Sequence, residues 1–231
     1  MAIEAVLFDF SGTVFRFEES EFWDAELTDA DGRALDTHEV AAIMRAMTAP
    51  VGQLFEFDEQ GQYAWDRRDL DPALHRAAYL QVLELSGVPQ VPAGQLYERM
   101  LDPKGWTPYG DTGEVLEQLH ERGIPVAIVS NIAWDIRPAF ATRGWDRFIG
   151  HFALSFEVGA IKPDRRIFES ALDHLGIAAE RALMIGDSLE ADGGATALGS
   201  DFALVQPLPI AERPTALRDA LIERGLIAAP S

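Results

Sequence analysis

The sequence of 231 residues contains no cysteine. Disulfide bonds, thiolate metal sites and cysteine nucleophiles are therefore excluded. Lysine is also scarce, because only Lys104 and Lys162 occur and the remaining basic residues are arginines. The formal net charge is -19 and there is no basic run. This balance argues against a protein that binds nucleic acid.

Long hydrophobic runs are absent as well. No apolar stretch reaches the length that a membrane-spanning helix needs, and the first residues lack the pattern of a signal peptide. We therefore expect no membrane association and a cytoplasmic location. The length allows one large α/β domain or a core with a smaller inserted domain. Nothing in the pattern indicates an oligomeric state.

Short apolar runs recur along most of the chain and are typical of buried parallel strands. They lie at residues 5–8, 125–129, 182–185 and 202–205, with a further candidate at 152–156. Helical patterns at residues 113–122, 136–143 and 165–175 separate them, and another follows at 215–224. This alternation predicts an α/β fold with a doubly wound, Rossmann-like parallel sheet.

Residues 15–104 have a different character. They lack buried-strand runs and show helical patterns at 38–47 (with Thr37 as the expected N-cap), 71–85 and 91–101. Residues 54–65 alternate apolar and polar side chains around Gly61, which predicts a small hairpin or a loop over the site. We expect a mostly helical inserted domain at 15–104 and a core made of residues 1–14 and 105–231.

Polar residues follow three of the expected strands. Because the carboxyl ends of parallel strands meet at one edge of a sheet, these residues should converge. The set consists of Asp9, Ser130, Asn131, Asp187 and Asp192, with Lys162 from a nearby loop. Carboxylate oxygens suit Mg²⁺, which usually binds together with substrate phosphate. A lysine and neutral donors suit phosphoryl oxygens, and a carboxylate such as Asp9 can act as a nucleophile.

These residues occur in four ordered motifs, which are Asp9-Phe10-Ser11-Gly12-Thr13, Val129-Ser130-Asn131, Lys162-Pro163-Asp164 and Gly186-Asp187-Ser188 followed by Asp192. With them the chain resembles the haloacid dehalogenase superfamily of hydrolases. The resemblance covers the whole length. It implies that residues 15–104 form a helical cap inserted after the first motif.

The resemblance also implies a role for each motif residue. Asp9 is expected to attack phosphorus and form an aspartyl-phosphate. Mg²⁺ is expected at Asp9, the backbone carbonyl of Ser11 and Asp187, with Asp192 as a ligand or a supporting residue. Residues expected to contact the phosphoryl group are Gly12, Thr13, Ser130, Asn131 and Lys162. Lys162 is also expected to keep the clustered carboxylates ionised.

Ser11 departs from the pattern of the family, whose phosphatases usually carry a second Asp there. That Asp protonates the leaving group and then activates water. A serine hydroxyl is a poor acid or base at neutral pH, and general acid–base catalysis contributes about 10²–10⁴-fold. We therefore expect a Mg²⁺-dependent phosphohydrolase for a small phosphorylated metabolite, with limited turnover and a preference for acyl or aryl phosphates.

Three alternatives remain open at the level of sequence. A 2-haloacid dehalogenase-like hydrolase needs no metal, and its family pattern lacks the Asp found here at position 187. A phosphonatase needs a cap lysine, whereas residues 15–103 contain none and Lys104 lies at the boundary. The third is a catalytically weak phosphometabolite-binding or regulatory protein that has kept the fold.

Overall fold

A computed structural model of the chain describes residues 2–17, 31–34 and 55–229. The helix predicted at 38–47 and its N-cap Thr37 lie outside these residues. A five-stranded sheet has the order β5-β4-β1-β6-β7, and every neighbouring pair is parallel. Its strands are β1 (Ala5–Phe8), β4 (Val126–Ser130), β5 (His151–Leu154), β6 (Ala182–Gly186) and β7 (Asp201–Leu204). The predicted parallel α/β sheet is confirmed.

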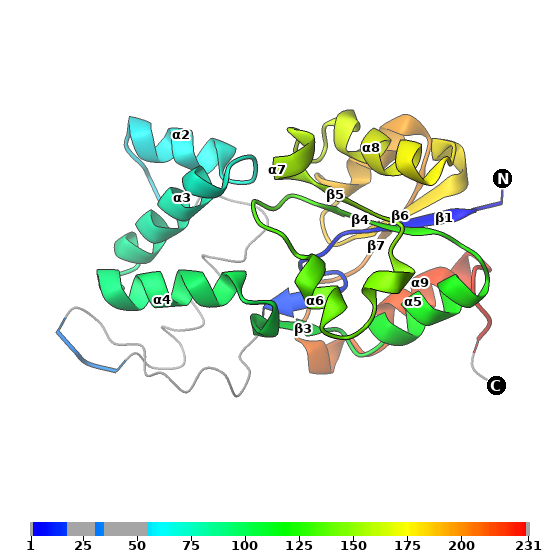
Figure 1. Cartoon of the computed structure of the whole chain (residues 1–231), viewed down its shortest axis with the longest axis horizontal. Coiled ribbons are helices and arrows are strands. Elements are labelled where there is room, and N and C mark those ends of the chain that lie inside the picture. The colour runs from blue at the N-terminus through cyan, green and yellow to red at the C-terminus, as the bar shows by residue number, and fades with distance from the viewer. Residues whose placement is uncertain (1, 18–30, 35–54, 230–231) are drawn as a thin grey trace.

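Helices cover both faces of this sheet (Figure 1). One face carries α7 (Ser155–Val158) and α8 (Arg165–Leu175), and the other carries α5 (Thr112–Glu121), α6 (Arg137–Ala141) and α9 (Ala216–Glu223). Alternate side chains of β1 enter the two cores, since Val6 and Phe8 belong to one apolar cluster and Leu7 to the other. Burial on both faces explains why the strands are continuous apolar runs.

The register of the sheet aligns the strand ends. Phe8 at the end of β1 pairs with Ile128 in β4 and with Ile185 in β6. The polar residues that follow β1, β4 and β6 therefore lie at the same edge of the sheet, where the carboxyl ends of the strands meet. Short 3-10 helices occupy several connections, which are η2 (Pro103–Gly105), η3 (Asp146–Phe148), η4 (Ala179–Arg181), η5 (Asp192–Leu198) and η6 (Ile210–Glu212).

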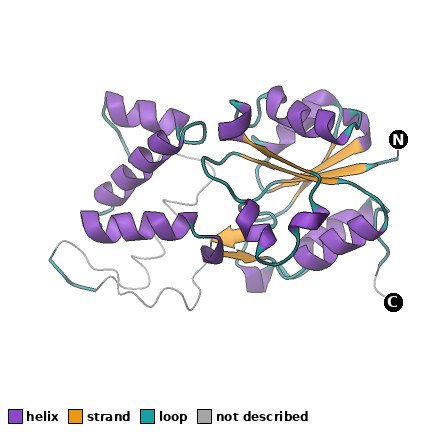
Figure 2. Ribbon diagram, viewed as in Figure 1, coloured by secondary structure: helices purple, strands orange, loops and turns teal. Residues whose placement is uncertain are grey.

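Three helices pack together beside the sheet, as Figure 2 shows most clearly. They are α2 (Glu59–Arg67), α3 (Pro72–Leu85) and α4 (Gln90–Leu101). Helix α3 begins as the sequence predicts, because the Asp71 carboxylate accepts hydrogen bonds from the backbone of Ala73 and Leu74 and Pro72 occupies the first turn. Among the described residues no helix combines the length and apolar character needed to cross a membrane.

The hairpin or loop predicted at 54–65 is wrong for its second half, which is helix α2. The Asp58 side chain accepts a hydrogen bond from the Gly61 backbone and starts this helix. Gly61 is not a turn residue. It lies against α3, where an added Cβ would come within 2.3 Å of the Gln81 side chain. Close packing of α2 against α3 therefore explains why residue 61 is a glycine, and no turn is needed there.

Two further elements differ from the sequence prediction. Strands β2 (Phe15–Phe17) and β3 (Trp106–Pro108) form an antiparallel pair that the pattern did not indicate. The strand predicted at 152–156 extends too far, because the chain turns into α7 at Ser155. The buried Ser155 hydroxyl contacts backbone groups of two loops and thus favours a turn over a longer strand.

Candidate active site

Asp9 lies directly after the central strand β1 and is 6% exposed. One carboxylate oxygen accepts a hydrogen bond from Lys162 Nζ at 2.6 Å, and the other accepts one from Thr13 Oγ1 at 3.2 Å. Burial raises the pKa of Asp9 to about 6, although the nearby lysine opposes the change. The ammonium therefore holds one oxygen of a carboxylate that is otherwise costly to bury.

Gly12 allows the loop after Asp9 to pass close to Asp187. Its φ is +78°, a conformation that other residues rarely adopt, and an added Cβ would lie 2.3 Å from Asp187 Oδ2. The Arg213 guanidinium donates a hydrogen bond to the Gly12 carbonyl at 2.7 Å and so stabilises the turn. A side chain at position 12 would displace the Asp187 carboxylate.

Lys162 is the central cation of the site and is 5% exposed. Its ammonium donates to Asp9 Oδ1 and Asp192 Oδ1, both at 2.6 Å, and to the Val129 carbonyl at 3.0 Å. Burial alone lowers the pKa of Lys162, but Asp192 and Asp9 outweigh it and raise the pKa above its ordinary value. The side chain is therefore a cation at neutral pH, and its ammonium donates a hydrogen bond to each of three protein oxygens.

Asn131 positions the backbone of Lys162. Its side-chain oxygen accepts a hydrogen bond from the Lys162 amide at 2.7 Å, and its side-chain nitrogen donates to the Lys162 carbonyl at 3.2 Å. This two-bond clamp joins the loop after β4 to the loop that carries the lysine. Asn131 also lines the cavity described below, as does Ser130.

Three carboxylates meet beside the lysine. Asp9, Asp187 and Asp192 each offer one oxygen, and these oxygens lie within 4.8 Å of one another. Burial, together with the negative charges of Asp9 and Asp192, raises the pKa of Asp187 to about 8. Asp192 is 1% exposed and also accepts a hydrogen bond from the Ser188 backbone at 2.9 Å. Such a cluster is costly unless cations or protons compensate it, and Lys162 supplies one positive charge for three carboxyl groups.

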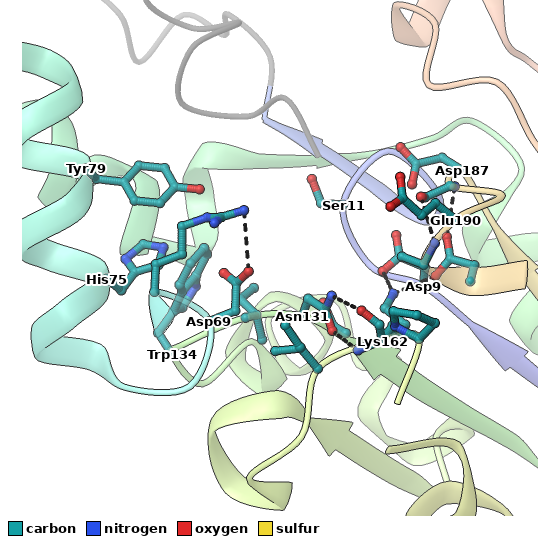
Figure 3. A pocket seen from close by; sticks show the side chains of 18 of the residues that line it. Asp9, Ser11, Asp69, His75, Tyr79, Asn131, Trp134, Lys162, Asp187 and Glu190 are labelled. Carbon is teal, nitrogen blue, oxygen red and sulfur yellow. Dashed lines mark hydrogen bonds and ion pairs between the residues drawn. The ribbon is translucent and has the colours of Figure 1, made fainter. Parts of the chain in front are cut away.

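A cavity of about 350 Å³ opens beside this cluster, and Figure 3 shows side chains that line it. Most of the residues that the sequence singles out line it, namely Asp9, Ser11, Ser130, Asn131, Lys162, Asp187 and Asp192. Gly12 and Thr13 are not among its lining residues. Thr13 is fully buried and donates to Asp9. The structure thus brings together residues that are separated by up to 183 positions in the chain.

The opposite side of the cavity comes from the α2–α4 helices and from the loop after β4. It includes Asp69, His75, Tyr79 and Trp134 (Figure 3). The His75 ring stacks on Tyr79 with centroids 4.2 Å apart and meets Trp134 edge-on at 5.0 Å. None of these four residues was predicted from the sequence. Asp69 and Trp134 reach the cavity from separate loops, and the one-turn spacing of His75 and Tyr79 marks a shared helix face but not what that face lines.

Comparison with known proteins agrees with this geometry. The profile of the haloacid dehalogenase-like hydrolase family matches residues 3–198. The chain belongs to this family of hydrolases. The resemblance drawn from the four motifs is thereby confirmed.

Curated relatives of this hydrolase match parts of it. Ribulose-1,5-bisphosphate 5-phosphatase of Halopiger xanaduensis is 37% identical over 99 residues, covering 42% of this chain and 41% of the relative. Glyceraldehyde 3-phosphate phosphatase of Methanothermobacter thermautotrophicus is 32% identical over 128 residues, covering 52% of each. The chain spans about half the length of the curated relatives it matches.

Solved structures share the fold over nearly the whole length. A protein described as a dehalogenase superimposes with a TM-score of 0.71 at 21% identity, covering 99% of this hydrolase and 98% of the other chain. The putative HAD-hydrolase YfnB from Bacillus subtilis, described as bound to magnesium, gives a TM-score of 0.68 at 20% identity with 97% and 100% coverage. At this identity the likeness establishes the fold alone.

Proposed function

We propose that this hydrolase is a Mg²⁺-dependent phosphatase that transfers the phosphoryl group of a small metabolite to Asp9. The observation that carries the proposal is the cluster of three carboxylates around one buried lysine at the floor of the cavity. Two curated relatives are named as phosphatases of small phosphorylated compounds, which supports the same class of substrate.

The donor set fits Mg²⁺. Three carboxylate oxygens lie within 4.8 Å of one another, and oxygen is the ligand that this ion prefers. We assign Asp9, Asp187 and the backbone carbonyl of Ser11 as ligands, with Asp192 as a ligand or as support through Lys162. When bound, the ion would neutralise charge on the phosphoryl oxygens.

Each of the side chains around the cavity then has a separate role in the proposed reaction. The Asp9 oxygen that accepts the Thr13 hydrogen bond attacks phosphorus, while Lys162 holds the other oxygen and keeps the group ionised. Ser130 faces the same cavity and offers a hydroxyl to the phosphoryl oxygens. Asn131 fixes the Lys162 backbone and so sets the position of the ammonium. In this proposal residues 15–104 act as the cap that encloses the substrate.

Phosphate release provides the test. The purified chain is incubated with a panel of phosphorylated metabolites, with Mg²⁺ or with EDTA, and inorganic phosphate is measured. Release should need the metal and should be abolished in Asp9→Asn, with Asp66→Asn as a control from the cavity rim. Metal binding without release from any substrate would favour a binding protein, and chloride release from 2-chloropropionate without metal would favour a dehalogenase.

A further inference from the structure

The proposed reaction lacks the acid that family phosphatases usually carry at position 11, because this residue is Ser. An alkoxide that leaves phosphorus is a strong base and departs slowly unless a proton reaches it. We propose that Asp69, in the loop between α2 and α3, is the general acid that protonates the leaving group and then the general base that activates water. This inference rests on the proposed phosphatase function.

The position of Asp69 matches the direction in which a leaving group departs. Asp69 lines the same cavity as Asp9 and Ser11, and it projects from the opposite side (Figure 3). The attacking and leaving oxygens of a phosphoryl transfer lie roughly in line across the phosphorus. A group that attacks from Asp9 therefore expels the leaving oxygen toward the side that carries Asp69.

Two other acids border the cavity and are less suited to this role. Asp66 is exposed and accepts a hydrogen bond from the Gln62 side chain at 2.7 Å. Glu190 is exposed and lies beside Asp187, on the side of the nucleophile. The Asp69 side chain, in contrast, is 18% exposed. A carboxyl group sheltered from water retains a proton more readily than an exposed one.

The charged and titratable groups around Asp69 are consistent with an acid. The Arg68 guanidinium lies 3.8 Å from the Asp69 carboxylate. The positive charge of Lys162 also stabilises the Asp69 anion, and the Tyr79 side chain lines the same cavity. Burial raises the pKa of Asp69 despite the two cations. The carboxyl group is therefore protonated more often than an ordinary surface Asp, while the cations stabilise the anion once the proton has left.

The backbone of Asp69 is fixed to the core. Its carbonyl accepts a hydrogen bond from the buried Ser155 hydroxyl, which in turn accepts one from the Ile132 amide at 2.8 Å. Ile132 follows Ser130 and Asn131, the residues at the end of β4. One serine thus holds the cap loop and the loop after β4 in a common position.

The two half-reactions balance. As the Asp9 oxygen bonds to phosphorus, the bond from phosphorus to the leaving oxygen breaks, and that oxygen keeps the electron pair and takes the Asp69 proton. The products are an alcohol, the aspartyl-phosphate and the Asp69 carboxylate. Asp69 then takes a proton from water as the water oxygen attacks phosphorus. The bond to Asp9 breaks, inorganic phosphate leaves, and both side chains return to their starting states.

The test compares two leaving groups in a single turnover with enzyme in excess and Mg²⁺ saturating. Glycerol release from glycerol phosphate needs a proton, whereas nitrophenolate release from p-nitrophenyl phosphate does not. Asp69→Asn should slow glycerol release by about 10²–10⁴-fold, the usual contribution of a general acid. It should leave the first release of nitrophenolate unchanged, which also shows that the variant is folded and its site intact.

Two further variants serve as a rescue and as a control. Adding Ser11→Asp to Asp69→Asn should restore glycerol release, because it places an acid at the family position. The matched control, Asp66→Asn, should change neither release. Equal slowing of both substrates by Asp69→Asn, or no slowing of either, would overturn the role of Asp69 and leave the proposed function standing. Failure of the unaltered chain to release either product would overturn the proposed function and this inference with it.

Discussion

At the scale of the residue, the site depends on a close approach between a backbone turn and a carboxylate. Gly12 has a φ of +78° and leaves no room for a Cβ beside Asp187. The same glycine bonds to Arg213 through its carbonyl. Position 12 therefore influences both the stability of the turn and the geometry of the proposed metal ligands.

Gly12→Ala should lower stability and weaken Mg²⁺ binding together. An alanine in the left-handed region costs about 1–2 kcal/mol, and the added Cβ pushes against Asp187. Gly123→Ala is the matched control, since Gly123 has a φ of +69° and its Cβ would meet no atom within 4 Å. Urea unfolding should show a loss in both variants, while calorimetric titration should show weaker Mg²⁺ binding only in Gly12→Ala. Equal metal affinity in the two would contradict the steric argument.

The carboxylate cluster predicts a dependence of stability on pH. The pKa of Asp187 is raised to about 8 in the folded chain from an ordinary value of 3.8, so the folded state binds the proton that the unfolded state has released. Its contribution therefore lowers stability as pH rises from about 4 to about 8. Mg²⁺ should reverse this, because the ion replaces the protons.

Thermal unfolding across that range tests this linkage. The gain in melting temperature caused by Mg²⁺ should grow toward the alkaline end, and Asp187→Asn should remove most of the growth. A gain that is independent of pH, or that is retained in the variant, would show that the ion binds elsewhere.

At the scale of the element, the strands were easier to predict than the α2 region. Strands buried on both faces must be short and apolar, and the runs at β1, β4 and β6 satisfy this directly. Alternation in residues 54–65 suggested a hairpin or a loop over the site, but Asp58 starts a helix there. Packing of Gly61 against Gln81 decides this region, and a contact across 20 positions is not visible in a local pattern.

Ser155 links two elements and gives a prediction at the same scale. Ser155→Ala removes the hydroxyl shared by the Asp69 carbonyl and the Ile132 amide. Leaving these buried groups unpaired should cost about 1–3 kcal/mol in the free energy of unfolding, measured by urea titration. If Asp69 is the proton donor, glycerol release should slow more than nitrophenolate release. Equal slowing would show that Ser155 only stabilises the fold.

At the scale of the whole molecule, the sequence predicted that the four motifs would converge, because parallel strands share one carboxyl edge. Asp9, Lys162 and Asp187 indeed meet around one cavity. The far side of that cavity was not predictable. Asp69 and Trp134 reach it through tertiary packing between helices and the sheet. Such packing produces no periodic pattern of residues in the sequence.

The net charge of -19 gives a prediction for the entire chain. The proposed substrate is a phosphorylated anion, which this charge repels at long range. Raising the ionic strength shortens the Debye length from about 30 Å at 0.01 M to about 10 Å at 0.1 M and screens this repulsion. With Mg²⁺ held saturating, kcat/KM should therefore rise over that interval. A fall would mean that attraction to Lys162 and the metal dominates the encounter.

The central claim is that Asp9 carries the phosphoryl group, and trapping that intermediate tests it most directly. The chain is mixed with Mg²⁺ and p-nitrophenyl phosphate, quenched in acid within the first turnover and measured by intact and peptide mass spectrometry. The account predicts one added phosphoryl group on the peptide that contains Asp9, and none in Asp9→Asn. Release of phosphate with no modified Asp9, or undiminished release by Asp9→Asn, would contradict it.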